Sequence, residues 1–160
     1  MALTAVNPEV ISTPSPQGLA LRKLLAEDSK TWKKGEMCFL TSGTVTPVVT
    51  TGKTDVYGIF AEDQATSTST SSVWVRVLEI GTELTMSVTN NGTAGTSTSV
   101  AIGTRFGAYG KTNVTYIDLN TTSGQLEVIG PLSTYDEYDD NQFDMDAAPG
   151  RVIVEFTAIS

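Results

Sequence analysis

The sequence predicts an all-β protein, with a small β-barrel or β-sandwich body over residues 35–160 and an extended N-terminal arm over residues 1–34. β-Branched residues alternate with period two in the middle of the chain. Thr and Ser, which suit strands and polar loops, make up about a quarter of the residues. Short apolar runs are separated by Gly, Ser, Thr and Asn, as in sandwiches and barrels. The 160 residues suffice for one domain with its own core.

The clearest strand signal lies between residues 72 and 88. One side of its first strand carries Val73, Val75 and Val77, and the other side carries Trp74, Arg76, Leu78 and Ile80. Residues 81–83 predict a turn into a second strand over 84–88, so that the two strands would form a hairpin. A body of this size fully buries only one face of each strand. The apolar content of the second side therefore predicts self-association through Trp74, Arg76 and Leu78.

The N-terminal arm combines prolines, cations and a few apolar side chains. Pro8, Pro14 and Pro16 predict extended chain over residues 1–18, whereas residues 19–25 have one apolar side and predict a short helix. Half of the 10 basic residues lie in the arm, ahead of a body with an excess of acidic residues. Such an arm can take its structure from the surface that it binds. The predicted partner-binding residues are Leu3, Val6, Val10, Ile11, Leu21, Arg22, Lys23 and Leu24.

Further strands are predicted along the body, near residues 36–41, 55–61, 114–119, 125–129 and 151–159. Residues 45–50 predict another strand, which Pro47 assigns to a sheet edge. Gly58 lies inside a predicted strand and indicates a bulge or a close backbone approach. Gly103, Gly107 and Gly110 predict bends in a curved sheet.

The composition argues against an enzyme and against a bound cofactor. The chain has no histidine, which removes imidazole metal sites and the Ser-His-Asp arrangement. Cys38 stands alone, and we expect it to be buried. The Gly-Lys-Thr sequences at Gly52 and Gly110 lack the earlier glycine that a phosphate-binding loop needs. We therefore expect no catalytic, cofactor-binding or metal-ligating residues.

Charge and hydropathy narrow the range of partners. The net charge of −8 argues against direct binding of nucleic acid, which needs a basic footprint. No apolar run approaches the ~20 residues of a membrane span, so we expect no membrane contact. The arrangement of charge, with a basic arm on an acidic body, favours a macromolecular partner instead.

Residues 134–146 hold the densest run of acidic and aromatic side chains. An EF-hand calcium loop does not fit, because the Gly and Glu positions counted from Asp136 are Asn141 and Ala147. Three interpretations stay open: a solvated acidic loop, a looser cation site, and contact with a basic partner surface. In the last case Tyr135, Tyr138 and Phe143 would be the anchors.

The order of these parts resembles the head decoration, or cement, proteins of tailed double-stranded DNA bacteriophages. The resemblance covers roughly residues 30–130 and rests on three stretches, which are residues 34–45 (KGEMCFLTSGTV), 56–63 (VYGIFAED) and 73–84 (VWVRVLEIGTEL). It implies a compact β-domain on the outer capsid surface, often trimeric, with an N-terminal arm along the major capsid protein. It transfers no catalytic residue. The protein would be made in the host cytoplasm and would stabilise the capsid lattice of the virion.

Two other functions fit the same sequence. Tail-tube and tail-tip proteins of phages also combine β-rich bodies with extended arms, and they form rings. A carbohydrate- or receptor-binding module would instead use exposed aromatic residues. The candidates for such a site are Tyr57, Trp74, Tyr109, Tyr116, Tyr135 and Tyr138. The apolar strand around Trp74 favours packing in a core or a subunit interface for that residue.

Overall fold

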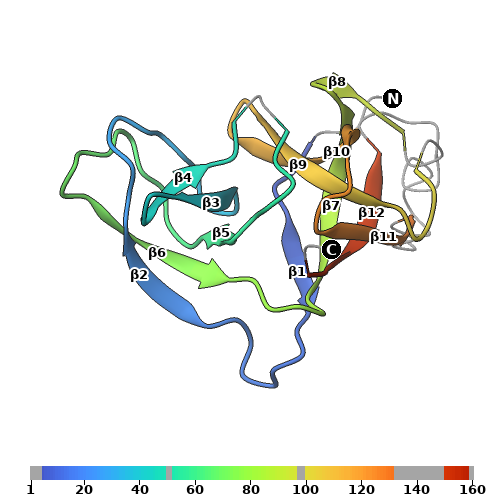
Figure 1. Ribbon diagram of the computed structural model, residues 1–160, viewed down its shortest axis with the longest axis horizontal. Helices are drawn as coiled ribbons and strands as arrows, with labels where there is room; N and C mark the ends of the chain where they lie inside the picture. The colour runs from blue at the N-terminus through green and yellow to red at the C-terminus, as the bar shows by residue number, and fades with distance from the viewer. Residues whose placement is uncertain (1–4, 50–51, 97–99, 132–149, 159–160) are drawn as a thin grey trace, which may run out of the picture.

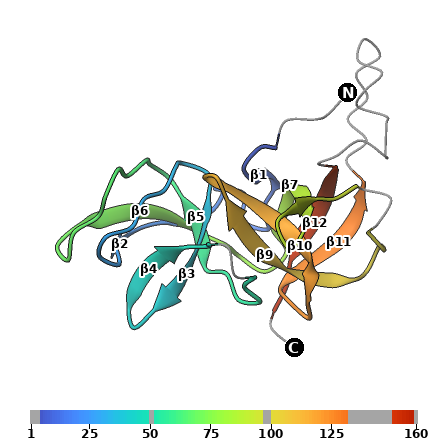
Figure 2. The same ribbon diagram turned by 90° about the horizontal axis from the view of Figure 1, so that it is seen from above.

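The computed structural model describes residues 5–49, 52–96, 100–131 and 150–158. In these ranges the chain forms twelve strands and no helix, so the predicted all-β fold class is confirmed (Figure 1). It follows that the described ranges hold no helix long and apolar enough to cross a membrane. The strands belong to two sheets, which lie side by side when the molecule is seen from above (Figure 2).

The first sheet closes into a five-stranded barrel. Its strands are β7 (Glu83–Asn90), β10 (Val114–Thr122), β9 (Arg105–Lys111), β11 (Leu126–Pro131) and β12 (Arg151–Phe156), in that order around the ring. The β7–β10 pair is parallel and the other pairs are antiparallel. Alternate residues of each strand point inward, so Leu84, Met86, Val152 and Val154 meet in the core. Two short strands extend the barrel by pairing with β7, namely β1 (Glu9–Ser12) and β8 (Thr93–Ala94).

The second sheet is antiparallel and strongly curled. Its order is β2 (Leu21–Leu25), β6 (Ser72–Val77), β5 (Gly58–Phe60), β3 (Met37–Thr41) and β4 (Thr44–Pro47). The two ends of this sheet meet at one parallel bridge, where Ala26 pairs with Val45. The curl encloses a second core in which Trp32 stacks on Phe60, with ring centroids 4.4 Å apart. The protein is therefore two small β-lobes, one closed by a full ladder and one closed by a single bridge.

The N-terminal segment is built into both lobes. β1 pairs with β7, and β2 pairs with β6, so the predicted short helix over residues 19–25 is wrong. An isolated helix of this length is marginal in water, whereas the β6 ladder pairs residues 21–25 with residues 72–76. Leu24 then points inward beside the second core, while its neighbours Lys23 and Leu25 are exposed. The segment is extended, as predicted, but it lies on the body and contributes an edge strand to each sheet.

The predicted hairpin over residues 73–88 is also wrong. β6 and β7 form as predicted, but they belong to different lobes, and residues 78–82 are the connection between the lobes. Leu78 donates its N–H to Tyr57 of the second lobe, and Gly81 donates to Phe156 of the barrel. The local alternation predicted both strands. Their pairing partners, however, are distant strands of the two different lobes.

A seam of backbone contacts joins the two lobes. The chain after β4 runs beside β9, where Lys53 and Ala108 exchange two hydrogen bonds of 2.8 Å. Gly107 and Gly110 make this possible: a Cβ on Gly110 would lie 1.8 Å from the carbonyl oxygen of Val48. Gly103, with φ +84°, lies in the turn before β9. Gly107 and Gly110 are therefore positions of close approach and not the predicted bends, and the glycine-rich stretch is a strand.

Several further predictions from the sequence, on one glycine and on strand positions, hold in full or in part. A Cβ on Gly58 would lie 2.5 Å from the carbonyl oxygen of Arg76, which confirms the predicted close approach. The segment with Pro47 forms β4, at the end of the second sheet. Of the strand predicted over residues 55–61, only residues 58–60 form ladder pairs. The end of the last predicted strand, at residue 159, lies outside the described residues.

Cys38 provides a test of the second core. The thiol is fully buried on β3, and burial raises its pKa to about 12. The reactive thiolate is therefore suppressed in the folded protein, whereas an unfolded chain has a thiol pKa near ~8.5. We expect Ellman's reagent at pH 8 to react with the thiol only after denaturant is added. Reaction of the native protein at the rate of the unfolded chain would contradict the structure.

Candidate functional site

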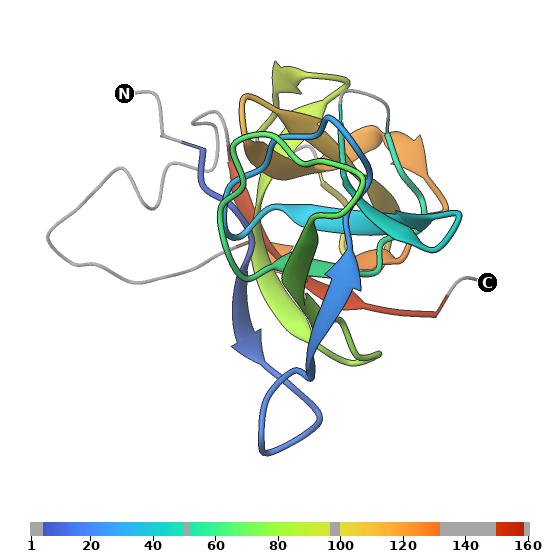
Figure 3. The ribbon, with the colours of Figure 1, turned by 90° about the vertical axis from the view of Figure 1, so that its left-hand side faces the viewer.

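The outer side of β2 and β6 carries large apolar side chains and cations. Val73 and Val75 point into the second core, so Trp74 and Arg76, which alternate with them, point outward. The antiparallel register places Leu21 opposite Arg76 and Lys23 opposite Trp74, and residues directly opposite each other share a face. Leu25 lies opposite Ser72 at the end of the same row. Figure 3 views the molecule from the side where β2 and β6 are in front.

The apolar members of this row are unusually exposed. Leu21 and Leu25 keep 52% and 53% of their surface accessible, and Trp74 keeps 40%. The Nζ of Lys23 lies 5.8 Å from the centre of the Trp74 ring, within the range of a cation–π contact. Neither Lys23 nor Arg76 forms an ion pair with any described residue. The row therefore combines exposed apolar surface with cations that have no anionic partner in the described chain.

The same surface continues onto β1. A groove of about 270 Å³ separates β1 from the second sheet, and Val10 and Arg76 both line it. Lys34 adds a cation to its lining and Glu9 adds an anion. Ile11, also on β1, is 50% exposed. We call the complete surface the apolar–basic face and define it by Val10, Leu21, Lys23, Leu25, Trp74 and Arg76.

The face unites residues that the sequence assigned to two different roles. Leu21 and Lys23 were predicted to bind a partner and Trp74 and Arg76 to mediate self-association, yet β2 and β6 place all four together. Trp74 lies on the surface and not in a core. Leu25 was not among the predicted partner-binding residues, although the predicted helix would place it on the same side as Leu21 and Leu24. The strand period would have identified it.

The remaining predicted site residues lie elsewhere. Leu78 is 6% exposed and belongs to the main core, because the chain turns inward after β6. Leu24 packs against the second core. Val6 is half-buried and hydrogen-bonded to Ser87, and Arg22 is exposed on β2 but points to the inner side of the ladder. Leu3 lies outside the described residues. The described members of this set do not contribute to the apolar–basic face.

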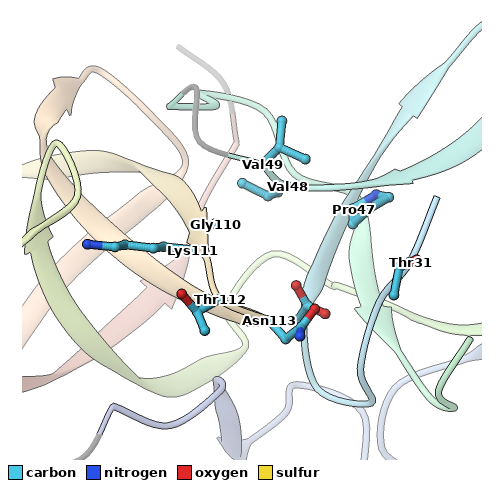
Figure 4. A pocket seen from close by; sticks show the side chains of 9 residues that line it. Thr31, Pro47, Val48, Val49, Gly110, Lys111, Thr112 and Asn113 are labelled. Carbon is cyan, nitrogen blue, oxygen red and sulfur yellow. The ribbon is translucent and has the colours of Figure 1, made fainter. Parts of the chain in front are cut away.

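A second hollow lies between the lobes. It has a volume of about 380 Å³ and is lined by the chain after β4 and by the turn between β9 and β10, as Figure 4 shows. Lys111 points away from this cleft and donates to the carbonyl of Gly92. The carboxylate of Glu36 is buried, which raises its pKa, and it accepts the backbone N–H of Lys33. The lining offers a satisfied carboxylate and small polar groups, so the cleft is a packing feature at the seam.

The described aromatic residues do not gather into one carbohydrate site. Tyr57 packs against the second core, and Tyr109 is buried in the barrel wall. Tyr116 lines a small pocket on the barrel, whereas Trp74 lies on the second lobe. Tyr135 and Tyr138 belong to the acidic segment, which lies outside the described residues. Within the described chain, Trp74 alone among these four lies on the apolar–basic face.

The fold defines a class, an all-β protein of two lobes, and the apolar–basic face is exposed on its surface. No protein-family model matches the chain, and a search of curated proteins finds no relative.

Proposed function

We propose that this protein is a non-enzymatic virion structural protein that binds the outer surface of a phage capsid and stabilises its lattice. The observation that carries the proposal is the apolar–basic face, formed by the N-terminal edge strands and β6 on a molecule of net charge −8. Exposed apolar residues rimmed by cations mark sites of protein–protein contact. The resemblance of roughly residues 30–130 to capsid decoration proteins is the reason for choosing a capsid as the partner.

The energetics of such a face suit a coating protein. Burial of one large aliphatic side chain contributes roughly 1.5–3 kcal/mol, so a few such residues support a modest single contact. Many copies on one lattice, linked to one another, would bind far more tightly through avidity. A protein that binds the assembled shell but not its loose subunits raises the free energy needed to separate those subunits. This is the proposed stabilising mechanism, with the major capsid protein and other copies of this chain as partners.

The experiment must preserve the fold. Removal of the N-terminal segment would delete β1 and β2 and so take an edge strand from each sheet. The substitutions Val10→Asp and Ile11→Asp instead change two exposed side chains of β1. We expect the double variant to bind bare capsids of the source phage at least about tenfold more weakly in co-sedimentation, because a buried carboxylate replaces apolar contact area.

The matched control is Ile102→Asp, which changes a 69% exposed isoleucine in the turn before β9. It should bind capsids like the unmodified protein. Equal binding of the β1 variant and the control would show that β1 does not contact the capsid. Bound protein should also raise the temperature at which capsids fall apart. Capsids that bind the protein and disassemble at an unchanged temperature would overturn the stabilising role.

A further inference from the structure

We propose that residues 132–149 of one copy dock on the β2–β6 part of the apolar–basic face of a neighbouring copy. This part consists of Leu21, Lys23, Leu25, Trp74 and Arg76. The inference deepens the self-association that belongs to the proposed function, because it names the contact between copies. It leaves Val10 and Ile11 of β1 for the capsid.

The chemistry of the two surfaces is complementary. The segment contains Asp136, Glu137, Asp139, Asp140, Asp144 and Asp146, with no Lys or Arg. It also contains Tyr135, Tyr138 and Phe143. The β2–β6 face supplies two cations without a described ion-pair partner and three large apolar side chains. Aromatic residues are effective anchors in apolar contacts, and carboxylates favour a surface that carries cations.

The position of the segment in the fold points to a neighbouring copy. Its ends are held together by the β11–β12 pair, where Pro131 lies opposite Val152. Figures 1 and 2 both show β11 and β12 at the end of the molecule opposite to β2 and β6. With both ends fixed in one place, 18 residues of chain have a maximum reach of about 30 Å from the barrel. The segment is therefore long enough to reach across to an adjoining molecule.

The contact has a definite symmetry. A segment that starts and ends at one end of a molecule and binds a face at the other end of the next molecule makes a head-to-tail contact, which closes into a ring when the rotation between copies allows it. The trimer expected from the sequence is one such ring. Because charge attraction contributes, the contact should weaken at high salt, where the Debye length falls from about 10 Å at 0.1 M to about 3 Å at 1 M.

A peptide experiment tests the docking itself. A synthetic peptide of residues 132–149 is added to a segment-neutralised variant of the full-length protein, in which the six acidic residues of 132–149 are replaced by Asn or Gln. The face of this variant is then not occupied by an acidic segment of the protein itself. The chain has two tryptophans, Trp32 fully buried and Trp74 on the face, so binding should change the Trp74 emission. We expect a saturable change in emission. Peptide binding should be at least tenfold weaker when the protein also carries Lys23→Glu and Arg76→Glu. A peptide with the six acids neutralised is the control. No change in emission at millimolar peptide would overturn the proposal.

A mixing experiment tests whether docking occurs between copies. Analytical ultracentrifugation should show assembly of the unmodified protein at 0.1 M salt, and loss of assembly in the face variant (Lys23→Glu with Arg76→Glu) and in the segment-neutralised variant. Mixed together, these variants still offer one intact face and one intact segment, so they should form dimers that cannot grow into rings. A mixture that stays monomeric, or a segment-neutralised variant that assembles normally, would contradict docking between copies.

The capsid assay separates this inference from the proposed function. If the segment-neutralised variant assembles normally while the β1 variant loses capsid binding, the proposed function stands and the inference falls. If the peptide binds the face but neither the unmodified protein nor any variant binds capsids, the docking stands and the capsid function falls. Another outcome is that the face variant keeps its self-association and yet loses the binding of individual molecules to the capsid. That result would assign the face to the capsid protein and overturn the inference.

Discussion

Replacement of Gly110 by alanine is expected to destabilise the protein by about 3 kcal/mol, at the upper end of the range for overpacking a filled interior. The added Cβ would lie 1.8 Å from the carbonyl oxygen of Val48, and backbone cannot move aside as a flexible side chain can. The hydrogen bond from the Gly110 N–H to the carbonyl of Val49, at 2.9 Å, would be strained with it. Chemical denaturation, followed by circular dichroism, measures the change.

Gly130→Ala is the matched control for that substitution. Gly130 also lies in a barrel strand, but no heavy atom comes within 4 Å of the Cβ that alanine would add. Its midpoint of unfolding should stay close to that of the unmodified protein. Equal midpoints for the Gly110 and Gly130 variants would mean that the seam between the lobes is not packed as described. A lower midpoint only for Gly110→Ala would support one cooperative unit made of two lobes.

Replacement of Trp32 by alanine should cost about 3–5 kcal/mol, the usual range for truncation of a buried aromatic residue. The indole has no accessible surface and stacks on Phe60 with an interplanar angle of 8°. Its N–H donates to the carbonyl of Glu62 at 3.0 Å. The second lobe closes through one bridge, and Trp32 and Phe60 are the two largest fully buried side chains of the described residues.

The second tryptophan supplies the control. Trp74→Ala removes a 40% exposed ring and its contact with Lys23, so the loss of stability should stay below about 1 kcal/mol. Fluorescence should report the same contrast, with a blue-shifted emission from Trp32 in the Trp74→Ala variant. Two substitutions of equal cost would contradict the placement of these residues. Because the Trp74 ring is exposed on the face, its emission can report docking in the peptide experiment.

The proposed division of surfaces has a simple physical basis. An exposed edge strand presents backbone donors and acceptors together with its side chains, and proteins commonly cover or charge such edges. Here β1 and β2 are both edge strands with exposed apolar residues, and Lys23 lies between Leu21 and Leu25. A cation at this position discourages pairing with strands of no charge and favours an acidic partner. The acidic segment of the same chain meets that requirement.

Local patterns in the sequence determined much of the secondary structure. The alternation in β6, β7 and β12 predicted which residues share a side of each strand, and the side with Val73 and Val75 and the side with Val152 and Val154 are the buried ones. The charge asymmetry identified the N-terminal segment as a candidate contact region, and Gly58 was recognised as a close approach. These features depend on residues two positions apart or on composition, so one sequence suffices to detect them.

Only the tertiary structure decided which strands pair and which surface remains open. β6 and β7 lie next to each other in the sequence and yet belong to different lobes, because their partners are strands far away in the chain. Residues 19–25 have the spacing of an apolar helix side, but the β6 ladder makes them a strand and turns Leu21, Lys23 and Leu25 toward Trp74 and Arg76. Nothing in the sequence next to Gly107 and Gly110 indicates that the chain after β4 packs against them. Long-range backbone pairing outweighs local preference at each of these points, and it is this pairing that assembles the apolar–basic face.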